Sequence, residues 1–400
     1  MLPRWTPNRR SVLKAIGLGG LGAAANMAGV VQTGVASAAV GAGVRALPVL
    51  PAPRARLEES FTTGWQSVQL HTHSNRVVAQ LPWTSPRKVF EWYMEHGYKA
   101  VALTNLLHFT PVAGLASELN DPGWFLVIQG EEPSFEPDGP GVRIVDTLGV
   151  GTTGPVDNGR ANRGTTTAEI WTNQSDAIRA VGGLPILAHP NLTWAGTGKD
   201  LAEADPKHNP IFVELVNTEP GINWRGGGGR PGVEAMWDEA LTRSKRRILA
   251  VCADDSHHFD GDVMSKSRRP DEPTSPPGRA WQMVHTDELT WPAIRRGLED
   301  PTSSYGTMGQ IGIRFVDLEV SRTGIKITLS DATDDLGWST PGHNPRLFTT
   351  YFIGEGGKVL DTTGSLKPEY KLKPGDGRYV RARVEASDCF DIAWTQPAFR

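Results

Sequence analysis

The chain has 400 residues, and its charges nearly balance, with 41 Lys and Arg against 44 Asp and Glu. This length exceeds the usual size of a single hydrophobic core, so we expect two domains. The ordinary composition, without a repeat or a long basic or acidic tract, argues against nucleic acid as a partner.

Residues 1–38 predict an export signal. Asn8–Lys14 resembles a twin-arginine signal, because paired arginines, an apolar position and a lysine follow in order. The uncharged stretch Ala15–Ala36 leads into small residues, which predict cleavage after Ala38. An uncleaved membrane anchor is the alternative, although the glycines make this stretch less apolar than most spanning helices. We therefore expect a periplasmic or extracellular protein, exported by the twin-arginine machinery, without a stable membrane anchor after cleavage.

The remaining chain would be acidic and poor in cysteine. The signal holds four of the basic residues and none of the acidic ones, so 37 basic residues would face 44 acidic ones. This balance argues against a surface that binds polyanions. Residues 39–60, rich in Pro, Ala and Gly, predict a linker. Cys252 and Cys389 are the only cysteines, and Cys252 lies in an apolar run that predicts core packing.

Between residues 61 and 303, strand-like runs alternate with helix-like segments. The expected strands are Trp65–Leu70, Tyr98–Thr104, Trp124–Gln129, Val142–Val150, Leu184–Ala188, Ile211–Asn217 and Arg247–Ala253. The expected helices are Ser85–Gly97, Thr165–Val181, Val233–Ser244 and Trp291–Leu298. This alternation predicts an α/β fold with a parallel sheet. Residues 304–400 instead contain short alternating runs divided by turn residues, which predict an antiparallel β-sandwich-like domain.

Side chains that commonly bind metals follow the ends of the predicted strands. His71 and His73 are two residues apart on one strand face and can therefore share an ion. The further candidates are Asn105, His108, Glu132, His189, Glu214, Asp255 and His257. In a barrel the carboxyl ends of successive strands meet at one edge, so these groups should converge. Such mixed nitrogen and oxygen donors suit Zn, Mn or Fe.

Four motifs in this order resemble the PHP family, the polymerase and histidinol phosphatase superfamily of metal-dependent hydrolases. They are His71/His73, Gly130-Glu131-Glu132, Ala188-His189-Pro190 and Asp255-Ser256-His257. The resemblance implies a distorted (β/α)7 TIM-like barrel over residues 61–303, with two or three metal ions and usually phosphoester hydrolysis. The extra β domain and the ending Ala393-Trp394-Thr395-Gln396-Pro397 look most like a secreted branch that includes carbaryl-hydrolase-like metallohydrolases.

One motif departs from the family pattern. Where the family usually has Thr-Asp-His, this chain reads Thr104-Asn105-Leu106, and Leu106 cannot bind metal. The family's third metal site is therefore in doubt, and His108 is either a substitute ligand or a solvated loop residue. Asn105 could bind metal weakly or orient the attacking water. Glu214 is either a ligand or an N-cap or ion-pair partner at the strand end.

The resemblance also implies roles for individual residues. Two divalent ions, Mn, Zn or Fe, would share Glu132 and activate a bridging hydroxide. Asp255 is the expected catalytic, metal-bound carboxylate, and the adjacent Asp254 is expected to orient a histidine by a hydrogen bond. His258 is either the proton donor to the leaving group or a surface residue.

These roles leave three hypotheses for the function. The leading one is an exported phosphoesterase that acts on a small molecule. The second keeps the metals but hydrolyses a carboxylic ester, carbamate or amide, with an aromatic pocket drawn from Trp83, Trp194 or Trp224. The third is a non-catalytic binding protein with a degenerate barrel.

Overall fold

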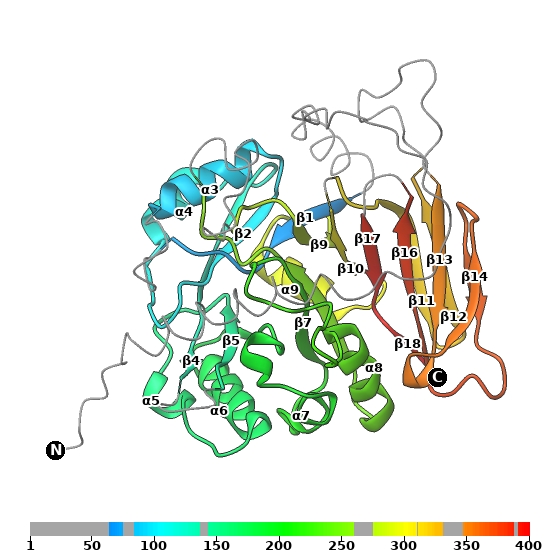
Figure 1. The fold of residues 1–400 in the computed structure, drawn as a ribbon. Helices are drawn as coiled ribbons and strands as arrows, with labels where there is room; N and C mark the ends of the chain where they lie inside the picture. Colours follow the sequence, from blue (N-terminus) through cyan, green and yellow to red (C-terminus); the bar gives the residue numbers. More distant parts are fainter. Residues whose placement is uncertain are drawn as a thin grey trace, which may run out of the picture.

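The computed structural model describes residues 64–74, 84–136, 143–259, 275–309, 311–330, 347–387 and 391–400. These residues form a mixed α/β structure with one large sheet and a smaller three-stranded sheet (Figure 1). The predicted signal at 1–38, the predicted linker at 39–60, Trp83 and Cys389 lie outside the described residues. Within the described ranges, every helix is too short or too polar to cross a membrane.

The strands of the first half are almost entirely buried. They are β1 (Trp65–Gln69), β2 (Ala100–Leu103), β3 (Leu126–Glu131), β4 (Ser134–Phe135), β5 (Val145–Val150), β6 (Leu184–Leu187), β7 (Ile211–Asn217), β8 (Ile248–Ala253) and β9 (Ala280–His285). In the sheet they follow the order β9-β1-β2-β3-β5-β6-β7-β8, with β4 beside β5. An isolated parallel bridge joins Thr72, just after β1, to Ser256, just after β8. The carboxyl ends of β1 and β8 therefore meet.

Helices follow most of these strands. They are α3 (Pro86–Glu95), α4 (Ala113–Leu119), α5 (Asn158–Ala161), α6 (Thr167–Ala180), α7 (Gly198–Glu203), α8 (Val233–Arg243) and α9 (Trp291–Glu299). The predicted helices are confirmed at α3, α6, α8 and α9. Their starts carry clear capping signals: Ser85 caps α3 ahead of Pro86, and Thr166 and Glu169 form a capping box on α6. The short α4, α5 and α7 carry too few turns for an apolar period to reveal them.

The predicted parallel sheet is wrong at β5, which pairs antiparallel with both β3 and β6. Among the residues that the structure describes between β3 and β5, only the two-residue strand β4 forms an element. A parallel connection needs a crossover of about a dozen residues or more, usually a helix. The chain turns back, so the last residues of β5 pair with the carboxyl end of β3, while its first residues lie beside β4 and the carboxyl end of β6.

The large sheet continues into the C-terminal part of the chain. The strands there are β10 (Ser304–Met308), β11 (Phe315–Ser321), β12 (Gly324–Leu329), β13 (Phe348–Ile353), β14 (Val359–Thr363), β15 (Glu369–Lys371), β16 (Tyr379–Ala386), β17 (Ile392–Thr395) and β18 (Ala398–Phe399). β10 pairs with β9 on one side and with β17 on the other, so the sheet runs unbroken through the predicted boundary at residue 304.

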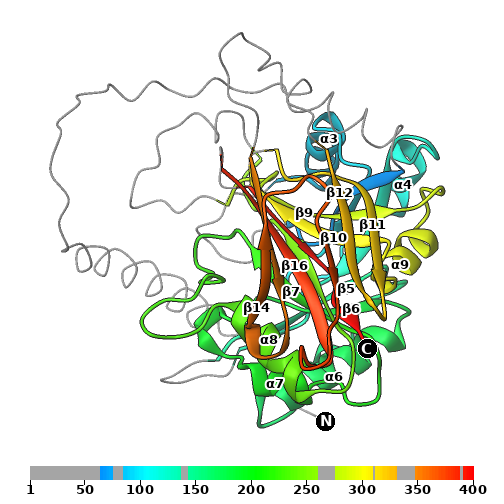
Figure 2. The same ribbon diagram turned by 90° about the vertical axis from the view of Figure 1, so that its right-hand side faces the viewer.

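Two layers form this C-terminal part. β17, β16, β13 and β14 extend the large sheet, while β11, β12 and β15 form the smaller one (Figure 2). Buried residues of both, such as Ile327 from β12 and Phe352 from β13, belong to one hydrophobic cluster. The antiparallel strands expected here are therefore present, and apolar side chains join the two layers.

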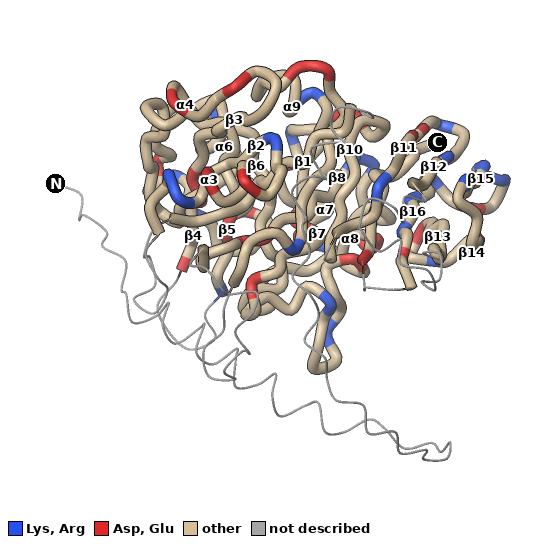
Figure 3. Tube along the Cα trace, turned by 90° about the horizontal axis from the view of Figure 1, so that it is seen from above, with Lys and Arg blue, Asp and Glu red and all other residues tan. Residues whose placement is uncertain are grey.

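A buried ion network attaches β16 to helix α8. The traces of β16 and α8 lie near each other in Figure 3. The Arg381 guanidinium, 1% exposed, contacts both oxygens of Asp238, with Nε–Oδ1 at 2.7 Å and Nη2–Oδ2 at 2.6 Å. Its Nη1 lies 2.8 Å from Oε1 of Glu234, and the group lies over the Trp237 ring. Because α8 follows β7, this network links the C-terminal strands to the part of the fold that carries the candidate site.

Candidate metal centre

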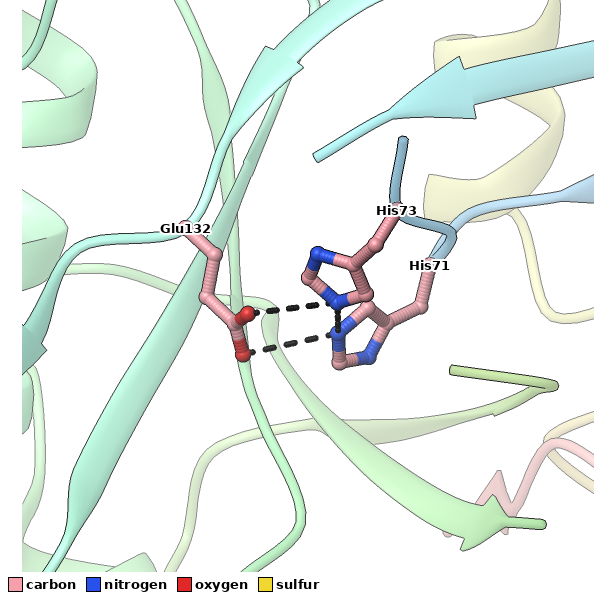
Figure 4. A group of neighbouring side chains, drawn as sticks. All are labelled: His71, His73 and Glu132. Carbon is pink, nitrogen blue, oxygen red and sulfur yellow. Dashed lines mark hydrogen bonds and ion pairs between the residues drawn. The ribbon is translucent and has the colours of Figure 1, made fainter. Parts of the chain in front are cut away.

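The structure brings together five of the predicted residues: His71, His73, Glu132, His189 and Asp255. The Nε2 atoms of His71 and His73 are 3.0 Å apart, and both rings face Glu132 (Figure 4). Glu132 Oε1 also contacts His189 Nε2. His73 Nε2 is 2.9 Å from Asp255 Oδ1, and His189 Nε2 is 3.1 Å from Glu132 Oε1. All five residues are buried. The convergence expected from the strand ends is therefore present.

Local backbone structure aims these side chains. His71 and His73 flank Thr72, whose hydroxyl turns the other way and lies 2.8 Å from that of Ser256. The backbone N–H of His73 donates to Ser256, and that of Asp255 donates to His71, which fixes the two strand ends against each other. Asp255 adopts the left-handed conformation, with φ 52°. A non-glycine residue held there is typical of functional sites.

Close packing requires glycine at the first position of the Gly-Glu-Glu motif. A Cβ on Gly130 would lie 2.8 Å from Thr104 Cγ2 and 2.9 Å from the carbonyl oxygens of Leu103 and Gly149. β3 can therefore approach its neighbouring strands this closely only with glycine at position 130. Glu132 lies two residues later, just after the end of β3.

Asp146, near the start of β5, is a site residue that sequence reasoning missed. Its Oδ2 lies 3.6 Å from His189 Nε2, and its buried Oδ1 has no hydrogen-bond partner among the described residues. Asp146, Glu132 and His189 lie close enough together to hold one ion. The available signal was a charged residue inside the apolar run of residues 144–150. It was overlooked because the expected parallel direction would have placed Asp146 at the opposite edge of the sheet.

The carboxylates and imidazoles shift one another's pKa values. Burial raises the pKa of Asp146 well above its usual range, and the nearby Glu132 adds to the rise. Burial also opposes ionisation of Glu132, but His71, His189 and His73 prevail and lower its pKa to about 2. Burial lowers the pKa of His189, yet Glu132 and Asp146 outweigh it and raise this pKa to about 10. The imidazoles thus balance the charge of Glu132, while burial beside Glu132 favours the protonated form of Asp146.

The donor set fits divalent metal ions. Two possible metal-binding groups share Glu132: the first consists of His71, His73 and Glu132, with Asp255 in contact with both histidines, and the second consists of Glu132, Asp146 and His189. Two further groups overlap them, His73 with Asp255 and His257, and His71 with His189 and Glu214. Imidazole nitrogen and carboxylate oxygen are the usual protein ligands of Zn, Mn and Fe.

Glu214 contacts the far side of the His71 ring. Its Oε1 lies 2.8 Å from His71 Nδ1, and its Oε2 accepts from the backbone N–H of His189 at 2.9 Å and from Asn217 Nδ2 at 2.9 Å. A proton on Nδ1 leaves the Nε2 lone pair of His71 facing Glu132. These contacts allow Glu214 to orient His71, and Glu214 also forms a possible metal-binding group with His71 and His189.

We expect Glu214→Gln to weaken metal binding without unfolding the chain. Glutamine keeps the volume but removes the charge that holds the proton on His71 Nδ1, and loss of such a partner typically costs about 10- to 100-fold in metal affinity. Competition with a chelating dye would measure the change. An unaltered affinity would contradict the orienting role.

The remaining candidates lie around the centre. Asn105 accepts from the backbone N–H of Ser74 at 2.8 Å and donates to Thr110 at 2.7 Å, so its amide fixes the strand end beside His73. His108 is exposed and belongs to none of the possible metal-binding groups among the described residues. The ring of His257 stacks on that of His73 with centroids 4.4 Å apart, and its Nε2 is 3.3 Å from Asp255 Oδ1. His257 therefore forms a further possible metal-binding group with His73 and Asp255.

Two further residues follow β8. His258 is partly buried, and its Nδ1 accepts from the backbone N–H of Ser275 at 3.0 Å. The prediction that Asp254 orients a histidine is wrong. Its carboxylate accepts from the backbone N–H groups of residues 278–280 at 2.6–2.7 Å and from the Tyr93 hydroxyl at 2.9 Å. Asp254 therefore anchors the loop at residues 278–280, while Asp255 contacts His71 and His73.

Comparisons with known proteins place few limits on this site. No family model matches the chain, and no curated protein matches it. Among solved structures, it is similar to a two-domain protein containing a predicted PHP-like metal-dependent phosphoesterase from Bacteroides vulgatus ATCC 8482. The two are 11% identical, with 86% of this chain and 95% of that chain covered and a TM-score of 0.39. A likeness of this degree establishes neither a shared fold nor a shared activity.

Proposed function

We propose that the chain is an exported, metal-dependent phosphoesterase with a dinuclear centre in a PHP-type (β/α)7 barrel. The observation that carries this proposal is the position of Glu132. Its Oε1 lies 3.1 Å from His189 Nε2 and 3.4 Å from His71 Nε2, and its Oε2 lies 3.5 Å from His73 Nε2. A carboxylate that contacts donors of both groups is suited to bridge two ions.

In this proposal His71, His73 and Asp255 hold one ion, Asp146 and His189 hold the other, and Glu132 joins them. Two divalent ions would supply Lewis acidity and a nucleophile at neutral pH. Their combined charge would exceed that of Glu132, Asp146 and Asp255, so the occupied centre would attract an anionic ester. The buried side chains around it would keep bulk water away from the reacting phosphorus.

His258 is the proposed proton donor to the leaving group. Because its Nδ1 accepts a hydrogen bond from Ser275, the neutral ring carries its proton on Nε2. Export by the twin-arginine machinery, cleavage after Ala38 and a location outside the cytoplasm complete the proposal, and they are supported by the arginine motif and the small residues before the cleavage point.

Hydrolysis of an aryl ester, carbamate or amide is the second candidate. Partly buried Trp194 follows His189 on the loop after β6, with the Arg230 guanidinium 5.2 Å above its ring. The Arg225 guanidinium lies 4.4 Å above Trp224, after β7, and Asn191 joins these loops by donating to Asn223 O at 2.6 Å. Tryptophan faces favour an aromatic substrate.

The experiment that tests the proposed function is a double substitution, His71→Ala with His73→Ala. The signal-free wild-type chain should contain about two equivalents of metal and hydrolyse phosphate monoesters. Mass spectrometry should show that the double variant, still folded by circular dichroism, has lost most of this metal and its activity. A wild-type chain that binds no metal after reconstitution would support the non-catalytic hypothesis. A metal-loaded chain that hydrolyses aryl esters but not phosphate esters would support the second candidate.

A further inference from the structure

The two donor groups of the candidate metal centre differ in chemistry. The first, which contains His71 and His73, supplies two imidazole nitrogens together with Glu132 and Asp255. The second supplies the carboxylates of Glu132 and Asp146 and one imidazole, that of His189. The first group therefore supplies two imidazoles, whereas the second supplies one imidazole and two carboxylates.

The backbone of Asp146 is held beside the second group. Its backbone oxygen accepts from the N–H of Ala188 at 3.1 Å and from Trp171 Nε1 at 3.1 Å. On the other side it pairs with Ser134 of β4. Its side chain is 3% exposed and lies beside His189. The oxygen-rich character of this group is thus built into β5.

Divalent metals differ in the donors that they prefer. Imidazole suits Zn and Fe, whereas carboxylate oxygen suits Mn and Mg. Two metal positions with the same donors should bind the same metal, whereas two positions with different donors should select different metals. The choice between metals depends here on Asp146, because this residue supplies the second carboxylate of the group that contains Glu132 and His189.

We propose that the two positions bind unlike metals, with Zn²⁺ at the position of His71, His73 and Asp255 and Mn²⁺ at the position of Asp146 and His189. This inference rests on the dinuclear centre of the proposed function. In this proposal, Asp146 determines which metal binds at the second position.

Metal competition on the full signal-free chain tests this assignment. The protein is stripped with a chelator and reloaded with about a tenfold excess of Mn²⁺ over Zn²⁺, because Zn binds most sites more tightly. Mass spectrometry should then find about one Mn and one Zn per chain, and electron paramagnetic resonance should show a single class of bound Mn²⁺. Two ions of the same metal in the wild type would overturn the proposal.

Substitutions at Asp146 give the second readout. In Asp146→His, the Mn content should fall about tenfold and Zn should fill both positions, while Asp146→Asn should keep Zn and lose Mn. The matched control is Asp317→His, on an exposed position of β11, which should load like the wild type. If either folded Asp146 variant retained wild-type Mn, the assignment would be wrong. If neither metal bound to the wild type, the proposed function itself would fail, so the two failures are distinguishable.

Discussion

Glu132→Gln should abolish hydrolysis while leaving the chain folded. The amide keeps the size of the side chain but removes the charge that both donor groups share. We expect the metal content to fall and the rate of phosphate-ester hydrolysis to drop by about 10³-fold or more, which corresponds to about 4 kcal/mol of transition-state stabilisation. Steady-state kinetics and metal analysis on the same preparation would measure both effects.

The neighbouring glutamate offers a matched control. Glu131 points away from the centre and accepts from the backbone N–H of Val156 at 2.8 Å and from Asn158 Nδ2 at 3.1 Å. Glu131→Gln should therefore keep both metals and nearly all activity. If Glu132→Gln kept its metal and its rate, the bridging role would be refuted.

Arg381→Met should cause the largest loss of stability outside the site. Methionine keeps much of the hydrocarbon volume but leaves the carboxylates of Asp238 and Glu234 without their buried cation. Breaking a buried ion pair by removing one partner typically costs about 3–5 kcal/mol. Chemical denaturation should show a much lower midpoint, with the metal content of the folded protein unchanged.

An exposed ion pair provides the comparison for this variant. Lys326 Nζ lies 2.8 Å from Glu319 Oε1, and both side chains are largely exposed. Lys326→Met should change the free energy of unfolding by less than about 1 kcal/mol. Equal midpoints for the two variants would mean that the network on α8 adds nothing to stability.

The sequence predicted most of the elements that build the site, because local patterns report local structure. The strand β7 and the helix α6 follow from apolar spacing and capping residues, and His71, His73, Glu132, His189 and Asp255 meet because strand ends meet. Cys252 is buried in the core as expected. The roles of these residues as metal ligands stay predictions.

The direction of a strand, by contrast, depends on its connection and not on its own residues. Nothing within residues 145–150 indicates that β5 runs antiparallel, and Asp146 was missed for that reason. Likewise, the partners of Asp254 and Glu214 come from segments far away in the sequence. The apolar spacing of a strand does not indicate which backbone N–H groups will bind a carboxylate that follows the strand.

The unbroken pairing of β9, β10 and β17 has a consequence for how the protein opens. β10 forms hydrogen bonds with β9 on one side and with β17 on the other. Separating β10 from either strand would therefore expose a row of unpaired backbone groups. The amide protons along β10 should be among the slowest to exchange with solvent. A chain cut at residue 304 would expose the edge of β9, which is the kind of bare strand edge that invites aggregation.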